Sequence, residues 1–320
     1  MIKLQEKILL DTKKIKVNAW RGSDSKNTLN YAALPGDKHL KKLPKNVEYV
    51  GPFLDFDGIT LFIDECFDLE NIHIVDKCKS KYKVAWIHEP RPLHNLQNNR
   101  LKTLEGMLDK FDFVMTYDEY LLDTYPEKCV YCIDNCFWIS DDMIKIHKKS
   151  KLASMIYSWK SDTEGHKLRH IIASTDGLDL YGSGCGRIIE FKEEGLADYY
   201  FSITIENSKS KYYFTEKILD CFACGTIPIY WGCKNIGDYF DERGIISFDS
   251  ISDLPQIFEK IGDMEYIESL QPYVKNNFEI VKQYHRYEDW IKENIYDKFL
   301  GKQSEKISVT KIRSKNVTNI

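Results

Sequence analysis

The chain has 320 residues, of which 43% are apolar and 29% charged, so it can bury two cores of ordinary domain size. Its formal charge of −4 and pI near 6.1 argue against a protein that coats nucleic acid, which needs a basic surface. The apolar run Ile8–Leu10 is too short for a signal peptide, and no stretch approaches the ~20 apolar residues of a membrane helix. We therefore expect a cytoplasmic protein that does not span a membrane, with its nine cysteines as reduced thiols.

Short apolar stretches separated by helix-compatible segments predict an α/β domain over residues 1–148. The predicted strands of this domain are 15–20, 59–63, 84–87, 113–116 and 130–133. The charged run Lys145–Lys151 at the end of the domain is typical of a linker and equally of an exposed helix end.

A second alternation predicts another Rossmann-like domain over residues 149–300, followed by a basic, flexible tail over 301–320. The predicted strands of this domain are 152–157, 178–181, 200–205, 227–231 and 244–248. The capping-box pattern of Ser161 and Glu164 precedes a predicted helix over about 165–173. Two consecutive α/β domains suit an enzyme whose ligands bind at the carboxyl ends of parallel strands.

The densest chemistry lies in residues 199–235, where an apolar strand ends at Glu206 and Thr215 can cap a helix through Cys224, which Gly225 ends. Backbone N–H groups converge at a helix start and form an anion site. Lys217 adds a positive charge for a phosphate there, and Glu216 can accept hydrogen bonds from sugar hydroxyl groups. The alternative is a capped helix between two core strands, with Glu216 and Lys217 merely solvated.

This stretch resembles the signature of the family 10 α-1,3/1,4-fucosyltransferases, particularly those of bacteria. The shared pattern, without a gap, is E-N-S-x-x-x-x-Y-x-T-E-K-I-L-D-x-x-x-x-G-T-I-P-I-Y-W-G. The resemblance implies the α/β GT-B fold, in which two Rossmann-like domains face each other across a cleft. It also implies an inverting glycosyltransferase that moves L-fucose from GDP-fucose to a hydroxyl group of a glycan acceptor, in protein glycosylation or polysaccharide biosynthesis, and needs no metal for its chemistry. The first domain would then bind the acceptor, and the second the nucleotide sugar.

By the same resemblance, four residues of this stretch would bind the donor. Lys217 would face the diphosphate, Glu216 the ribose, and Asn207 and Tyr213 the phosphate or fucose end. Glu206 would be structural and hold the loop.

A further donor group is expected where the second domain opens, because residues 154–170 resemble the family's strand, serine-containing loop and basic helix start. The family's phosphate-binding arginine falls on Arg169 or Lys167, and the spacing leaves both open. Arg169 is preferred because a bidentate guanidinium suits a diphosphate. The alternative for His166 and His170, a metal pair, lacks a nearby third ligand.

Displacement of a nucleotide from an anomeric carbon requires a base that takes the proton of the attacking hydroxyl group. The predicted strand 84–87 is followed by Glu89, and the family shows a glutamate shortly before a proline at this point, which implies that Glu89 is the base. Many members have E-S-P where this chain has E-P-R-P, so a capped loop carboxylate is the alternative. The segment Phe113–Asp118 resembles the family's L-T-Y-R-x-D stretch in the same order.

The sequence also allows other functions, but the residues that point to them are less specific. The pairs Cys129/Cys132 and Cys221/Cys224 could form a zinc site, but thiols at such a spacing within a helix are usually core residues. The basic tail carries enough charge for, at most, weak peripheral contact with an acidic membrane. Rival readings are a GT-B transferase for another nucleotide sugar and a non-catalytic module that binds a nucleotide or a sugar.

Overall fold

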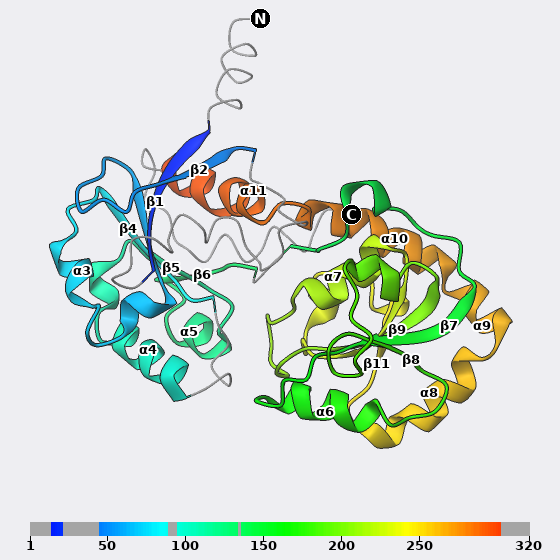
Figure 1. Cartoon of the computed structure of the whole chain (residues 1–320). Coiled ribbons are helices and arrows are strands. Elements are labelled where there is room, and N and C mark those ends of the chain that lie inside the picture. The colour runs from blue at the N-terminus through cyan, green and yellow to red at the C-terminus, as the bar shows by residue number, and fades with distance from the viewer. Residues whose placement is uncertain (1–13, 22–44, 89–94, 134–135, 302–320) are drawn as a thin grey trace, which may run out of the picture. The chain divides into compact units, whose positions relative to one another are not determined.

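The computed structural model describes residues 14–21, 45–88, 95–133 and 136–301, which form two compact units (Figure 1). The first unit combines residues 1–132 with 286–320, and the second comprises residues 133–285. The division of the chain therefore differs from the predicted one at both boundaries, 148/149 and 300/301.

The first unit is built on a six-stranded parallel sheet in the order β2-β1-β3-β4-β5-β6. Its strands are β1 (Ile15–Arg21), β2 (Val47–Val50), β3 (Ile59–Ile63), β4 (Tyr82–Trp86), β5 (Phe113–Thr116) and β6 (Cys129–Tyr131). Its helices before the second unit are α3 (His73–Lys77), α4 (Asn95–Glu105) and α5 (Glu119–Thr124). The apolar pattern does not predict β2, which lies at the edge of the sheet and buries only Val47 of its four residues.

The C-terminal segment belongs to the first unit because aromatic side chains attach it to that sheet. The segment consists of α11 (Tyr287–Ile291), a π-helical turn (Lys292–Tyr296) and α12 (Asp297–Gly301). Tyr287 packs against Trp86 of β4 with ring centroids 5.5 Å apart, and Phe299 packs against Phe113 of β5 at 4.8 Å. Apolar periodicity predicts a helix here but not the sheet that it covers, which explains the difference at the second boundary.

The second unit holds a five-stranded parallel sheet in the order β11-β10-β9-β7-β8. Its strands are β7 (Lys151–Ile156), β8 (Asp179–Tyr181), β9 (Tyr199–Ile205), β10 (Ile227–Trp231) and β11 (Ile246–Ser247). Its helices are α6 (Glu164–Ile172), α7 (Glu216–Ala223), α8 (Leu254–Ile261), α9 (Met264–Ser269) and α10 (Gln271–Val281). All five strands lie within two residues of the predicted ones.

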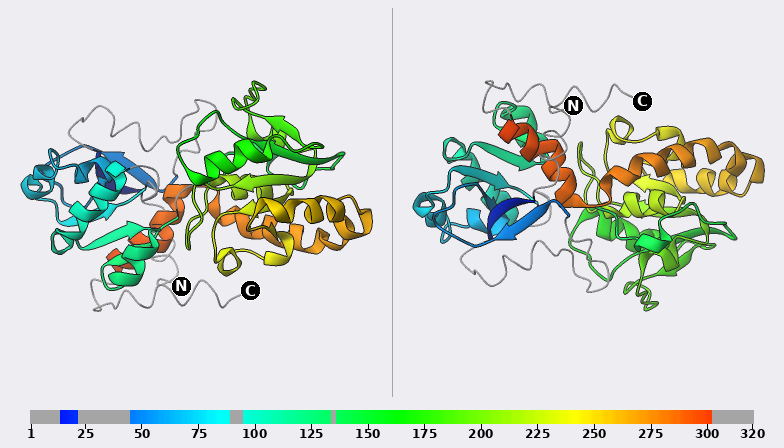
Figure 2. Two further views of the ribbon diagram at one scale, coloured as in Figure 1. Left: turned by 90° about the horizontal axis from the view of Figure 1, so that it is seen from below. Right: turned by 90° about the horizontal axis from the view of Figure 1, so that it is seen from above.

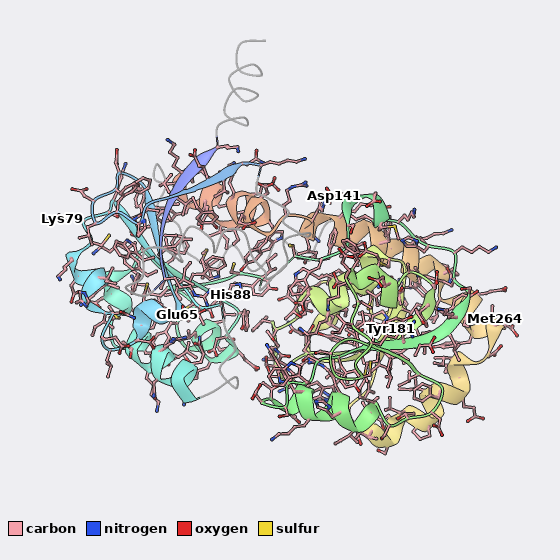
Figure 3. All side chains as sticks on the ribbon, in the orientation of Figure 1. Glu65, Lys79, His88, Asp141, Tyr181 and Met264 are labelled. Atoms are coloured by element: carbon pink, nitrogen blue, oxygen red, sulfur yellow. The ribbon has the colours of Figure 1, made fainter. Side chains whose placement is uncertain are left out.

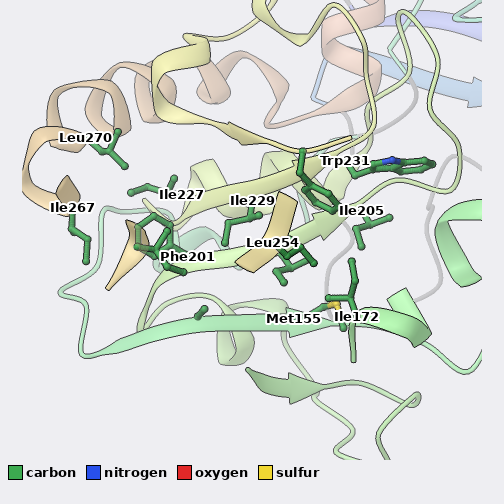
Figure 4. Packing of buried hydrophobic residues seen from close by; sticks show 14 of the residues in the cluster. Met155, Ile172, Phe201, Ile205, Ile227, Ile229, Trp231, Leu254, Ile267 and Leu270 are labelled. Carbon is green, nitrogen blue, oxygen red and sulfur yellow. The ribbon is translucent and has the colours of Figure 1, made fainter. Parts of the chain in front are cut away.

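Alternate residues of the central strand β9 point to opposite faces of this sheet. Phe201 and Ile205 join one apolar cluster that includes Leu254 of α8 (Figure 4). On the opposite face, Oγ1 of Thr204 lies 3.2 Å from Sγ of Cys221 in α7. Helices therefore cover both faces, with α8 on one and α7 on the other (Figures 1 and 2). This is a doubly wound α/β domain.

Among the described residues, no helix combines the length and the apolar character that a membrane crossing needs. Apart from Gly301, the predicted tail over 301–320 lies outside the part of the chain that the structure describes.

Helix α6 approaches the end of β9 very closely, and a glycine makes this possible. Gly165, the second residue of α6, donates its N–H to the carbonyl oxygen of Asn207 at 3.2 Å. A Cβ at residue 165 would lie only 1.7 Å from the carbonyl oxygen of Glu206. Any side chain there would therefore push the start of the helix away from the strand.

Gly165→Ala should lower the free energy of unfolding by about 1–3 kcal/mol, the usual cost of overpacking a well-packed site. Gly262→Ala is the matched control in the same unit, because a Cβ there would meet nothing closer than 3.5 Å. The control should change stability by less than about 1 kcal/mol. Urea unfolding measures both variants, and equal stability of the two would contradict the close approach.

Candidate active site

The strand order of the second unit indicates where a ligand is expected. The chain passes from β7 outward to β8 and then returns to β9 on the other side of β7, so the winding reverses between β7 and β9. In sheets of this order, ligands bind at the carboxyl ends of the two strands where the direction reverses. Those ends lead into the starts of α6 and α7. The topology therefore selects the same two helix starts as the sequence motifs do.

Helix α6 begins with a capping box, but two residues later than the sequence predicts. The cap is Thr163, and the predicted box of Ser161 and Glu164 is wrong, because Glu164 is the first helical residue. Oγ1 of Thr163 accepts the N–H of His166 at 3.2 Å, and Nδ1 of His166 accepts the N–H of Thr163 at 3.3 Å. A histidine thus takes the place that glutamate or glutamine usually occupies in this motif.

Arg169 points from α6 back to the end of β9 and is buried. Its Nη2 donates to the carbonyl oxygen of Ile205 at 2.6 Å and to Oδ1 of Asn207 at 2.9 Å. Burial lowers the pKa of Arg169 and the Glu206 carboxylate opposes that shift, yet a guanidinium stays protonated at physiological pH. Lys167 is exposed on the same helix. The structure therefore brings Arg169, and not Lys167, into contact with Asn207.

Helix α7 begins after the predicted cap, Thr215, and a buried carboxylate holds this cap in place. The N–H and Oγ1 of Thr215 donate to the two carboxylate oxygens of Glu206 at 2.9 and 2.7 Å. Tyr230 donates a longer hydrogen bond to the same carboxylate at 3.4 Å. Burial raises the pKa of Glu206, and the charge of Lys217 opposes that rise. These contacts give Glu206 the structural role that the resemblance implies.

Lys217 and Glu216 form an ion pair in the first turn of α7. Nζ of Lys217 lies 3.1 Å from Oε1 of Glu216 and 3.7 Å from Oε2 of Glu206. Burial lowers the pKa of Lys217, but the two carboxylates outweigh this and raise it above its usual value. Burial also opposes ionisation of Glu216, but the charges of Lys217 and Lys192 hold its pKa below the usual value. Glu216 is 7% exposed, so the alternative of a merely solvated pair is wrong.

The starts of α6 and α7 are electrostatically coupled. The charge of Arg169 acts on Lys217, and the charge of Glu216 acts on Arg169. Burial, together with the positive charges of Arg169, Lys160 and Lys217, lowers the pKa of His166 to about 4, against the opposing charge of Asp162. Basic side chains from two helices therefore share one site in the second unit.

The structure gathers most of the predicted donor residues at this site. They are Arg169, Asn207, Tyr213, Glu216 and Lys217, with Tyr213 buried and Asn207 half-buried. His166 also belongs to this site, although from the sequence it was considered only as half of a metal pair. The signal that could have found it is a polar side chain three residues after a capping threonine.

The metal hypotheses gain no geometric support. Across the described ranges, no three His, Cys, Asp or Glu side chains are grouped so that they could hold a metal ion. The cysteines of both C-x-x-C pairs are buried, as core thiols are.

In the first unit, the predicted base Glu89 lies outside the described residues, and the structure describes its neighbour His88 (Figure 3). Oη of Tyr117 donates to the carbonyl oxygen of His88 at 2.9 Å. The N–H of His88 donates to Oδ1 of Asp64 at 3.1 Å, and burial raises the pKa of Asp64 to about 6. The His88 ring also packs edge-on against Trp86 at 5.3 Å. The carbonyl and the N–H of His88 are therefore both hydrogen-bonded where the chain leaves β4.

The two α/β units, each built on a parallel sheet, have the fold of the GT-B class, and the second carries cations and carboxylates at its switch point. The solved structure of a sucrose-phosphate synthase from Thermosynechococcus elongatus shares this fold, with a TM-score of 0.51 at 12% identity over 76% of this chain and 74% of that one. The chain belongs to glycosyltransferase family 10, the fucosyltransferases. The model of the C-terminal region of that family matches residues 146–315, more than half of the chain.

Two curated relatives match shorter segments. An α-(1,3)-fucosyltransferase from Helicobacter pylori is 34% identical over 82 residues, which is 26% of this chain and 16% of that protein. An α-(1,4)-fucosyltransferase from Arabidopsis thaliana is 31% identical over 71 residues, which is 21% of this chain and 18% of the relative. Each match therefore spans less than a fifth of the relative's length.

The low pKa of His166 predicts an acid-sensitive fold. The unfolded state binds a proton at this residue below about pH 6.5, whereas the folded state binds it only near pH 4, so stability falls as the pH drops through this interval. Between pH 6.5 and 4, the free energy of unfolding should fall by roughly 2 kcal/mol more for the wild type than for His166→Gln. Urea unfolding across this range measures the difference.

His170→Gln is the control for this comparison, because His170 is exposed on the same helix. Its pH dependence should follow that of the wild type. Parallel curves for the wild type and His166→Gln would contradict a buried, neutral His166.

Proposed function

We propose that this family 10 member is an inverting, α-1,3-fucosyltransferase-like enzyme that transfers L-fucose from GDP-fucose to a hydroxyl group of a glycan acceptor. The observation that carries the proposal is the joint placement of Arg169 and Lys217 at the switch point, in contact with Asn207 and Glu216. These residues belong to the motifs that resemble those of enzymes that use GDP-fucose.

The diphosphate of the donor would bind at the starts of α6 and α7. The N–H groups of Gly165, His166 and Lys217 already donate to acceptors outside the helices, so the helix starts contribute chiefly the partial positive charge of their dipoles. The Lys217 side chain is 23% exposed, so its ammonium group can exchange Glu216 for a phosphate oxygen. Arg169 is fixed by two hydrogen bonds to Ile205, and its Nη1 makes no hydrogen bond with any described residue. Its charge and this nitrogen are therefore available to the diphosphate.

The other donor contacts follow from the same arrangement. Glu216, in the first turn of α7, would accept hydrogen bonds from the ribose hydroxyl groups when Lys217 turns to the phosphate. Asn207 is already oriented by Arg169, and with Tyr213 it would contact the phosphate or fucose end.

The proposed reaction needs a base on one side of the anomeric carbon and charge stabilisation on the other. Glu89 would take the proton of the acceptor hydroxyl group as its oxygen attacks C1, and the C1–O bond to GDP breaks on the opposite face, which inverts the configuration. The electron pair of that bond goes to the diphosphate. Lys217, Arg169 and the helix starts would offset this negative charge, and no metal ion is part of the proposal.

Lys217→Ala should weaken GDP binding by about 10- to 100-fold, because a hydrogen bond between charged groups is worth about 1.5–3 kcal/mol. Lys167→Ala removes an exposed lysine from α6 and should change the Kd by less than about threefold. Isothermal titration of each variant with GDP measures the difference. An equal loss in both variants would assign the phosphate contact to Lys167 as well.

The same titration with UDP tests the nucleotide. We expect GDP to bind at least about tenfold more tightly, and GDP-fucose to give a transferred product with mixed glycan acceptors. Equal or tighter binding of UDP would replace the proposal by a GT-B transferase that uses another nucleotide sugar.

Glu89→Gln should lower kcat by about 10²- to 10⁴-fold, the usual contribution of a general base, while the Kd for GDP changes by less than about twofold. Glu70→Gln, an exposed carboxylate of the same unit, is the control and should retain turnover. Product detection with GDP-fucose measures both. Turnover of Glu89→Gln near that of the wild type would remove Glu89 from the mechanism.

A further inference from the structure

His166 occupies the third position of α6, inside the proposed donor site, and no motif shared with the family assigns it a role. Although it lies in the first turn of the helix, it is only 5% exposed. Three observations together show which of its ring atoms is available for binding.

The first observation fixes the tautomer. The backbone N–H of Thr163 donates to Nδ1 of His166 at 3.3 Å, so Nδ1 must offer its lone pair. A neutral imidazole carries one proton, which then resides on Nε2. His166 is therefore a donor at Nε2.

The second observation concerns charge. The groups that act on His166 are Arg169 of the same helix, Lys217 of α7, and Lys160 and Asp162 of the preceding loop. Three of these four are cations, and burial adds to their effect, so the imidazolium form is unfavourable at neutral pH.

The third observation concerns partners. Nδ1 is occupied by Thr163, whereas Nε2 makes no hydrogen bond with any residue that the structure describes. Nε2 is not one of the buried, unpaired side-chain atoms of the described residues, so this atom reaches the surface of an otherwise buried ring and can meet a ligand that supplies the acceptor.

We propose that His166 is a further ligand of the donor nucleotide, whose Nε2–H donates a neutral hydrogen bond to an oxygen of the diphosphate. This inference rests on the proposed function, because it takes the diphosphate to lie at the starts of α6 and α7. A hydrogen bond from Nε2–H would orient the diphosphate without adding a third full positive charge beside Arg169 and Lys217. GDP then remains able to leave after transfer, because binding does not depend on one more ion pair.

The tautomer and the contact can be observed directly in the full-length protein labelled with ¹⁵N in its histidine rings. Two-bond ¹H–¹⁵N spectra at pH 7 should show His166 as the neutral Nε2–H tautomer. GDP should shift the Nε2–H resonance and leave Nδ1 as the acceptor. An Nδ1–H tautomer, or an Nε2–H resonance that saturating GDP leaves unchanged, would overturn the inference.

Two variants test the contribution to binding. His166→Gln keeps an acceptor for the Thr163 N–H and an amide N–H that reaches the position of Nε2, so its Kd for GDP should stay within about threefold of the wild type. His166→Asn can still accept from Thr163, but its side chain is too short to replace Nε2–H, and its Kd should rise about tenfold. Urea unfolding at pH 7 checks that both variants are folded.

Lys217→Ala distinguishes a failure of the His166 contact from a failure of the proposed donor site. If Lys217→Ala weakens GDP binding and folded His166→Asn does not, the contact from His166 is wrong while the donor site stands. If neither variant affects GDP binding, the proposed donor site itself is wrong. Equal losses in His166→Gln and His166→Asn would show that the side chain acts only through the cap of α6, which would also overturn the inference.

Discussion

Glu206 is the residue on which the geometry of the site depends. It follows β9, and its N–H donates to the carbonyl oxygen of Trp231 in β10 at 2.9 Å. Its own carbonyl group faces Gly165, so that α6 can begin directly against the strand end. Its carboxylate holds the cap of α7 through Thr215. Because a buried carboxylate is costly unless it is paired and hydrogen-bonded, these contacts are mutually dependent. One residue thereby fixes two helix starts at the switch point.

The cations of the site are held in position before any ligand arrives. Lys217 is paired with Glu216 and lies near Glu206, and Arg169 is bound to the carbonyl oxygen of Ile205. Two carboxylates and two cations balance each other, and His166 is neutral beside them. Such a site needs little reorganisation to accept a diphosphate, because the positive groups only exchange one oxygen partner for another. The partly exposed ammonium group of Lys217 can make this exchange.

The sequence predicts the fold well where the apolar stretches are long and buried. Strands such as Ile227–Trp231 in the second sheet are predicted because they are buried along their whole length. The edge strand Val47–Val50 is short and half exposed, and its pattern is too weak to recognise. The end of the second domain is misplaced because the packing of Tyr287 on Trp86 is a tertiary contact that no local pattern encodes.

The site follows the same rule. The start of α7 is predicted correctly because Thr215, Glu216 and Lys217 are contiguous and belong to a long motif. The start of α6 depends on contacts between distant segments, such as that of Gly165 with Glu206, and its cap is therefore misplaced. His166 was weighed only as half of a metal pair, and the charge of Lys217 that acts on it comes from α7, a segment distant in the sequence.

The most direct test of the account is a crystal structure of the full-length protein with GDP. The account predicts that diphosphate oxygens lie within hydrogen-bond distance of Nζ of Lys217 and of the backbone N–H groups at the start of α6 or α7. A diphosphate bound elsewhere in the second unit, with Lys217 still paired to Glu216 and no phosphate at either helix start, would contradict it.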